Sequence, residues 1–242
     1  MNDFYVGYLP KAPEQLGRFI RNCVLILVAL ALTSALLLVA GQARFADSSF
    51  EYQQYKDYEG TVTTTPYPNL LAGGGRYLLV APGKFGADSL LQNFDLRSVR
   101  LRGVLIQSGS QKMLELDPAS IRIASDRTSH RDEVIALGPI TLTGEIADSK
   151  CYVGAMNPGI GKVHRGCAVR CISGGISPSF VVADANGIHK ALLLTGADGR
   201  KLGREVLDYV GEPVRIRGKI ARLGDQLILR AEPRQFERLD WE

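Results

Sequence analysis

The sequence predicts a mainly β protein, in which one N-terminal transmembrane helix is followed by two small β-barrel domains in tandem. Three observations lead to this fold class. An uncharged apolar run occupies residues 23–40. From Tyr58 onwards, short runs rich in Val, Ile, Leu and Thr alternate with turn residues, as in all-β domains. The second half of the chain also repeats the pattern of the first.

The apolar run, CVLILVALALTSALLLVA, is about as long as a helix must be to cross a ~30 Å hydrocarbon core. We therefore expect a transmembrane helix over residues 23–41. The nearest flanking charges place the N-terminus in the cytoplasm and the bulk of the chain on the outer side. A cleaved signal peptide, cut near residues 41–43, is the alternative. The long N-terminal region and the length of the run favour an uncleaved anchor.

This topology divides the first part of the chain into three segments. Residues 1–22 form a short cytoplasmic stub, in which Phe4, Tyr5 and Tyr8 could lie at the membrane interface or dock to a partner. Residues 42–57 are polar and without a strong period, which is typical of a tether. Cys23 lies in the apolar run, where we expect a small residue that faces lipid or packs against a neighbour.

The two β domains are expected over residues 58–126 and 138–239. Strands of the first are predicted at residues 60–65, 76–80, 99–106 and 113–123, with a short helix over residues 88–96. Strands of the second are predicted at residues 140–147, 180–183, 188–195, 214–221 and 226–231. A helical or turn segment covers residues 201–210, and Asp184-Ala185-Asn186-Gly187 is a hairpin signal.

The two halves read as an internal repeat. Leu78-Leu79-Val80 matches Leu192-Leu193-Leu194, and the segment 99–105 matches 214–220 with Gly103 and Gly218 at the same position. The second half has extra length before the match, at the place of a cysteine-containing loop. Chance similarity of strand composition is the alternative. Five short strands with a helical segment before the fourth predict an OB-like barrel, with a sandwich as the other possibility.

The loop over residues 148–178 contains Cys151, His164, Cys167 and Cys171. Glycine and proline are so frequent in it that we expect a long ordered loop without regular structure. Loops of this length in compact domains are usually functional. Lys150, Lys162, Arg165 and Arg170 give it a positive character, which would lower thiol pKa values or only solvate the surface.

These four side chains are of the type that zinc or iron prefers, so the loop predicts a metal site. A disulfide between two of the three cysteines is the alternative, because it could stabilise the fold by ~3 kcal/mol. A Cys–His nucleophilic pair ranks lower, since no third orienting residue is evident. No Cys-x-x-Cys-His run for haem attachment is present. A net charge of +4 without a dense Lys/Arg stripe argues against nucleic-acid binding.

The segment from Gly144 to Cys151, with His164, Cys167 and Cys171 after it, resembles a group of small exported bacterial domains. In that group, a strand ending in Asp-Ser-x-Cys leads to a His and a Cys-x-x-x-Cys pair, and then to an OB-like barrel. The likeness covers about residues 140–232 and implies a fold and a site, but no reaction. The whole architecture also looks like membrane-anchored accessory subunits of bacterial cytochrome b and Rieske-type electron-transfer systems.

Together with the topology expected from the apolar run, these likenesses imply a single-pass protein of the bacterial inner membrane, with its N-terminus in the cytoplasm and most of its chain in the periplasm. The first functional expectation is an accessory or structural subunit of a respiratory or electron-transfer complex, without catalytic activity of its own. Its partners would be other integral-membrane and periplasmic subunits. The alternative is a stand-alone periplasmic protein that uses Cys151, His164, Cys167 and Cys171 for metal binding or thiol redox chemistry. A cysteine-dependent enzyme comes third.

Overall fold

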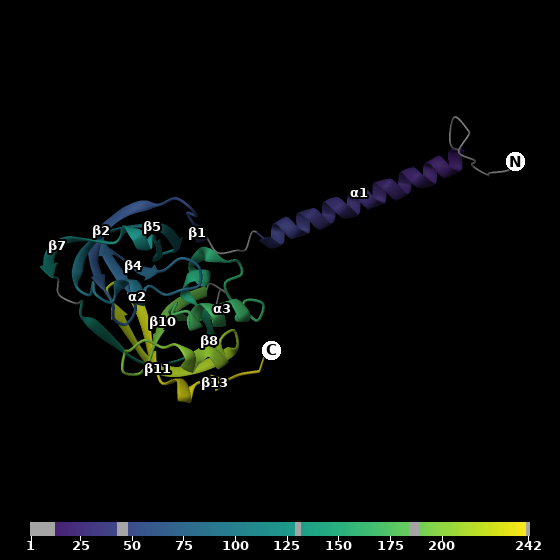
Figure 1. Ribbon diagram of the computed structural model, residues 1–242. Coiled ribbons are helices and arrows are strands. Elements are labelled where there is room, and N and C mark those ends of the chain that lie inside the picture. Colours follow the sequence, from purple (N-terminus) through teal and green to yellow (C-terminus); the bar gives the residue numbers. More distant parts are fainter. Residues whose placement is uncertain (1–12, 43–47, 129–131, 184–188, 241–242) are drawn as a thin grey trace. The chain divides into compact units, whose positions relative to one another are not determined.

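The computed structural model describes residues 13–42, 48–128, 132–183 and 189–240 (Figure 1). The chain divides into two compact units, residues 1–46 and residues 47–242. Within the described residues, the first unit contains one helix and the second contains the β-strands. The predicted roles of Phe4, Tyr5, Tyr8 and the hairpin signal at 184–187 lie outside the described residues.

Helix α1 spans Glu14–Gln42. Its stretch Glu14–Gly41 is long and apolar enough to cross a membrane. The hydroxyl of Thr33 donates a hydrogen bond to the carbonyl of Ala29 at 2.8 Å, so this polar group is satisfied within the helix. The helix begins before the predicted residue 23 because residues 14–22 contain no proline and continue the helical pattern.

Five strands of the β unit close into a barrel that we call the first ring. They are β2 (Lys56–Thr63), β3 (Asn69–Ala72), β4 (Gly75–Val80), β5 (Arg97–Ser108) and β6 (Gln111–Leu116). Neighbours pair in the cycle β5-β2-β3-β4-β6-β5, in which only β4 and β6 are parallel. Helix α2 (Asp88–Leu91) lies between β4 and β5 in the chain and places Leu91 in the barrel core.

A second set of five strands, the second ring, repeats this cycle. Its members are β8 (Val134–Asp148), β9 (Pro178–Ala183), β10 (His189–Thr195), β11 (Pro213–Leu223) and β12 (Gln226–Ala231). The pairing order is β11-β8-β9-β10-β12-β11, and only β10 and β12 are parallel. The 3-10 helix η3 (Arg204–Tyr209) precedes β11, and β13 (Glu237–Arg238) adds to its edge.

Two glycines occupy the same place in the two rings. Gly60 on β2 pairs with Val99, and Gly144 on β8 pairs with Val214. A Cβ at Gly60 would lie 2.1 Å from the carbonyl oxygen of Leu71, and a Cβ at Gly144 would lie 2.1 Å from that of Val181. Only glycine permits such a close approach of strands. The residues of the predicted repeat therefore occupy equivalent strands in the two rings, β2 and β5 in the first and β8 and β11 in the second.

Several predicted boundaries differ from the structure. Residues 113–123 do not form one strand, because Pro118 begins the 3-10 helix η1 (Pro118–Ser120), which Asp117 caps by accepting a hydrogen bond from the Ala119 amide at 3.1 Å. Strand β7 (Arg122–Thr128) follows it and pairs with β5. Strand β3 was not predicted. The predicted tether contains β1 (Ser48–Phe50), which pairs with β5 and packs the Phe50 ring on buried side chains.

The two rings share an apolar cluster, which includes Leu78, Ile106 and Met113 of the first ring and Leu193 and Ile228 of the second. Tyr67, in the β2–β3 connection, is buried in this cluster. Its hydroxyl donates to the carbonyl of Leu194 at 2.7 Å and accepts from the amide of Leu202 at 2.9 Å. The rings therefore pack through a common interior and belong to one compact unit.

Candidate functional site

The four residues that the sequence singled out lie in the connection between β8 and β9, at residues 149–177. The prediction of a loop without regular structure was wrong. The connection contains a short π-helix, η2 (Cys151–Ala155), and a helix, α3 (Arg165–Ser173). The corresponding connection in the first ring, between β2 and β3, covers only residues 64–68. The cysteine-containing segment is thus an insertion in the second ring.

Helix α3 explains the spacing of three site residues. His164 has helical backbone angles directly before α3, and Cys167 and Cys171 lie on the helix. Positions separated by three, four and seven residues fall on one face of a helix. The His-x-x-Cys-x-x-x-Cys pattern therefore points its three side chains the same way. Glycine and proline in the segment mark the turns before and after α3 rather than the absence of a helix.

Asp148, the last residue of β8, orients the site. Its Oδ2 lies 3.0 Å from Nε2 of His164, and its Oδ1 accepts a hydrogen bond from the backbone amide of Cys151 at 2.9 Å. The side chains of Asp148 and His164 are 0% and 4% exposed, so the pair is shielded from water. Sequence reasoning missed Asp148 as a site residue, although it opens the Asp-Ser-x-Cys motif at the end of a strand.

The structure brings the predicted residues together. Sγ of Cys151 lies 3.9 Å from Sγ of Cys167. Cys151, His164 and Cys167 each offer a donor atom within 4.8 Å of the other two, and Asp148, Cys151 and Cys171 form a second such set. All four cysteines of the chain, Cys23 among them, are free thiols. Cys151 is the residue that the two donor sets have in common, so it lies at the centre of the site.

A lysine of the first ring contacts two of the cysteine sulfurs. Nζ of Lys84 lies 2.7 Å from Sγ of Cys167 and 3.8 Å from Sγ of Cys171. Lys84 lies in the connection between β4 and α2. This connection is held against the end of α3 by a hydrogen bond from the amide of Gly86 to the carbonyl of Gly174 at 3.0 Å. A Cβ at Gly174 would lie 2.0 Å from the carbonyl oxygen of Lys84, so the two backbones meet where only glycine fits. The Gly83-Lys84-Phe85-Gly86 sequence was the available signal for this contact.

Lys150, expected as one of the positive residues of the loop, is buried and points into the first ring. Its ammonium forms an ion pair with the carboxylate of Glu115 on β6. It also donates hydrogen bonds to the carbonyls of Ala81 at 3.2 Å and Gly83 at 2.6 Å. The buried charge is therefore paired and hydrogen-bonded, as burial requires. Together with Lys84, it joins the two rings at the site.

The thiols differ in acidity because they share a proton. A hydrogen bond from the Cys151 thiol lowers the pKa of Cys171 to about 7, and the positive charge of Lys84 acts in the same direction. The same hydrogen bond, followed by burial, raises the pKa of Cys151. The pKa of Lys84 is itself raised, first by its hydrogen bond to Cys167. Cys171 therefore ionises before Cys151, and the Cys151 thiol and the Lys84 ammonium both favour its thiolate.

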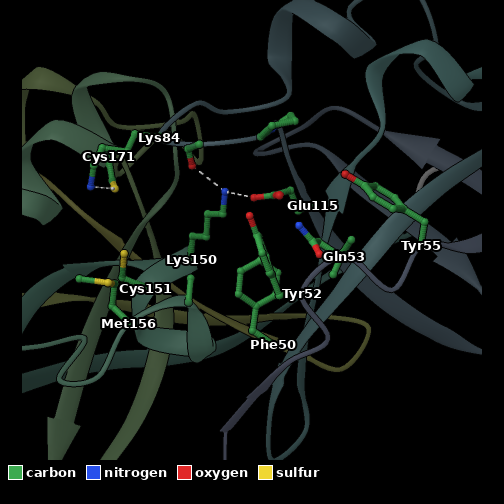
Figure 2. A pocket seen from close by; sticks show the side chains of 14 residues that line it. Phe50, Tyr52, Gln53, Tyr55, Lys84, Glu115, Lys150, Cys151, Met156 and Cys171 are labelled. Atoms are coloured by element: carbon green, nitrogen blue, oxygen red, sulfur yellow. Dashed lines mark hydrogen bonds and ion pairs between the residues drawn. The ribbon is translucent and has the colours of Figure 1, made fainter.

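A pocket of about 620 Å³ adjoins the thiols (Figure 2). Cys151, Cys171 and Met156 contribute sulfur-bearing side chains to one side of it, and Phe50, Tyr52 and Tyr55 contribute aromatic rings to the other. Lys84, Lys150 and Glu115 also line it. Both rings and the segment after β1 therefore build the pocket.

The donor set fits a soft or borderline metal ion. With Zn–S bonds of about 2.3 Å, two sulfurs on one tetrahedral zinc ion are separated by about 3.8 Å, and the Cys151 and Cys167 sulfurs are 3.9 Å apart. His164 holds its Nε2 toward a carboxylate, which is the arrangement that fixes a metal-binding imidazole so that its other nitrogen can coordinate. Zinc or iron would be held by Cys151, His164 and Cys167.

Comparison of the chain with family models, with curated proteins and with solved structures finds no match. The function proposed below therefore depends on the arrangement of the site residues.

Proposed function

We propose that this protein is a membrane-anchored metal-binding protein, whose centre consists of Cys151, His164 and Cys167 and takes zinc or iron. The observation that carries the proposal is the separation of 3.9 Å between the Cys151 and Cys167 sulfurs beside a histidine bonded to a buried aspartate. A disulfide alone would not need His164 and Asp148 in the same buried place. A metal centre uses all four groups.

Cys171 and Lys84 lie next to the three proposed ligands and contribute to this centre. Cys171 is 1% exposed and shares a ligand set with Cys151, so it supplies a third sulfur, and a fourth possible ligand, within reach of the site. Lys84 donates toward the sulfurs of Cys167 and Cys171, which offsets the negative charge of several thiolates around one divalent ion. A closed centre with four protein ligands is typical of structural zinc, and an open one is typical of catalytic zinc.

The direct test is metal analysis of the full chain, purified from membranes of its own host in mild detergent without chelators. We expect about one zinc or iron ion per chain, loss of that metal in Cys151→Ser and Cys167→Ser, and full metal content in Cys23→Ser, the matched control in α1. Thiols are counted on the same unreduced sample. A metal-free protein with three alkylated cysteines, or with a Cys151–Cys167 disulfide, contradicts the proposal.

We also propose that both rings are OB domains. Support comes from the strand cycle, in which the first strand pairs with the second and fourth, and the third pairs in parallel with the fifth. A helical segment precedes the fourth strand in each ring, α2 in the first and η3 in the second. In this reading the metal centre occupies an insertion between the first two strands of the second OB domain.

A second candidate function is that of an accessory subunit in a respiratory or electron-transfer complex of a bacterial inner membrane, with its β unit in the periplasm. The observation that favours it is α1, whose apolar surface includes the small residues Ala31, Ser34 and Ala35, where another helix could approach closely. Native electrophoresis of mild-detergent extracts tests it. Migration with larger membrane proteins supports a subunit, and migration at the monomer mass contradicts it.

A further inference from the structure

We propose that the pocket beside the thiols binds low-molecular-weight disulfides that carry aromatic and anionic groups, and that the metal-free Cys151–Cys171 pair reduces them. This activity does not depend on the metal centre, because it is a property of the same cysteines when no ion holds them. It rests on three features of the pocket, namely its volume, its two walls and its two thiols.

The pocket has the size and composition of a small-molecule site. Its volume of about 620 Å³ lies within the ~300–1,000 Å³ typical of such sites. The rings of Phe50, Tyr52 and Tyr55 form an apolar wall on which an aromatic group can stack (Figure 2). The ammonium of Lys84 lies at the opposite, sulfur-bearing side. A ligand with an aromatic group at one wall and a negative charge near Lys84 matches both.

The disulfide bond of such a ligand would lie against two cysteines. Cys151 and Cys171 line the pocket, whereas Cys167 does not. Both thiols are buried in the protein, at 4% and 1% exposure, so the pocket is the route by which a small molecule reaches them. Their sulfurs lie within 4.8 Å of each other, close enough for one to resolve a mixed disulfide formed by the other.

The reaction balances without a further reactant. The Cys171 thiolate, beside Lys84, attacks one sulfur of the ligand disulfide, which forms a Cys171–ligand mixed disulfide and releases the first ligand thiolate. The Cys151 thiol then loses its proton and attacks the Cys171 sulfur, which forms the Cys151–Cys171 disulfide and releases the second ligand thiolate. The protein loses two electrons and the single Cys151 proton, and the ligand disulfide takes up the two electrons and leaves as two thiolates.

The test uses the aromatic dianionic disulfide 5,5′-dithiobis(2-nitrobenzoate) and the full chain, stripped of metal in detergent. The parent protein is Cys23→Ser/Cys167→Ser, which retains only the two pocket cysteines. We expect release of both thionitrobenzoate groups, a protein mass that carries no adduct, and a Cys151–Cys171 disulfide. In the Cys151→Ser derivative we expect release of one group and a stable mixed disulfide on Cys171. Loss of the second release step is the signature of a resolving cysteine.

The aromatic wall is tested by Tyr52→Ala, at a residue that is 65% exposed, so the substitution opens no cavity in the core. We expect about a tenfold slower reaction with the aromatic probe, from the loss of a ring contact, and an unchanged rate with the small neutral 2-hydroxyethyl disulfide. Phe85→Ala, a 62% exposed aromatic residue outside the pocket lining, is the matched control and keeps the parent rates.

Two results overturn the proposal: a mixed disulfide that the parent protein never resolves, or equal rates for Tyr52→Ala and Phe85→Ala with the aromatic probe. Failure of the metal proposal gives a different result, because metal content is measured before the protein is stripped. If the protein binds no metal but releases both thionitrobenzoate groups, the metal proposal fails and the disulfide-reduction proposal holds. If it binds metal but keeps the mixed disulfide on Cys171, the metal proposal holds and the disulfide-reduction proposal fails.

Discussion

Nζ of Lys84 lies 2.7 Å from Sγ of Cys167, although the two residues are 83 positions apart in the chain and belong to different rings. The contact depends on the backbone approach of Gly86 and Gly174, which brings the β4–α2 connection against the end of α3. The first ring is therefore part of the site. It supplies the positive charge that the thiols of the second ring require when they are ionised.

The acidity of Cys171 predicts a pH dependence of thiol reactivity in the metal-free protein. Its pKa of about 7 lies below the ordinary value, so the reactive thiolate predominates above pH 7 and is lost by protonation below it. We expect alkylation of Cys171 to rise with a midpoint near pH 7, as followed by mass spectrometry of the cysteine-containing peptides. A midpoint near that of an ordinary thiol would contradict the proton-sharing arrangement.

Lys84→Met should move this midpoint to higher pH, because it removes the positive charge that favours the thiolate. Alkylation of Cys171 at pH 7 should fall accordingly. Lys219→Met, on an exposed lysine of β11, serves as the matched control and should leave the profile unchanged. Equal profiles for Lys84→Met and the parent protein would show that Lys84 does not act on the thiols.

Asp148→Asn should weaken metal binding about 10–100-fold, the usual effect of removing a carboxylate that orients a metal-binding histidine. The amide is similar in size to the carboxylate but is uncharged and has one acceptor oxygen in place of two, so it cannot accept from both the Cys151 amide and His164. Competition with a chromogenic zinc chelator measures the change. Asp208→Asn, on a residue of η3, is the control and should bind zinc as the parent does.

Gly174→Ala should destabilise the β unit by about 1–3 kcal/mol, because its Cβ would overlap the carbonyl oxygen of Lys84. Gly166→Ala, within α3 itself, provides the contrast. No atom lies within 4 Å of the Cβ that it adds, and alanine favours helix, so stability should rise by ~0.5–1 kcal/mol. Urea unfolding followed by circular dichroism separates the two. Equal effects would mean that the rings do not meet at Gly174.

Tyr67→Phe should cost about 1–3 kcal/mol of unfolding free energy, because it leaves the carbonyl of Leu194 and the amide of Leu202 without this partner. The effect would locate part of the stability in the contact between the rings. The control, Tyr52→Phe, removes a hydroxyl from a 65% exposed side chain and should change stability by less than about 0.5 kcal/mol. Thermal unfolding of both variants would show whether the buried hydroxyl matters more.

The sequence by itself determined the features that depend on local pattern. An uncharged run of residues predicts a helix apolar enough for a membrane, and α1 has that character. Alternating apolar residues predict strands, and Val99 and Val214 pair with Gly60 and Gly144 at matching places in the two rings. Cys151, His164, Cys167 and Cys171 were predicted to form one site, and the structure places them in two donor sets that share Cys151. Each of these follows from residues that are close in the chain or repeated at the same spacing.

Tertiary structure decided what depends on contacts between distant segments. Helix α3 was missed because the many glycine and proline residues of the segment suggested a loop throughout. The helical spacing of His164, Cys167 and Cys171 did not by itself show where a helix begins and ends. Asp148 and Lys84 became site residues only when the end of β8 and the β4–α2 connection were folded against α3. Lys150 resembles a surface lysine in the sequence, yet it is buried because Glu115 of the other ring neutralises its charge. The position of each of these lysines depends on a partner from the other ring: Lys150 pairs with Glu115, and Lys84 contacts Cys167.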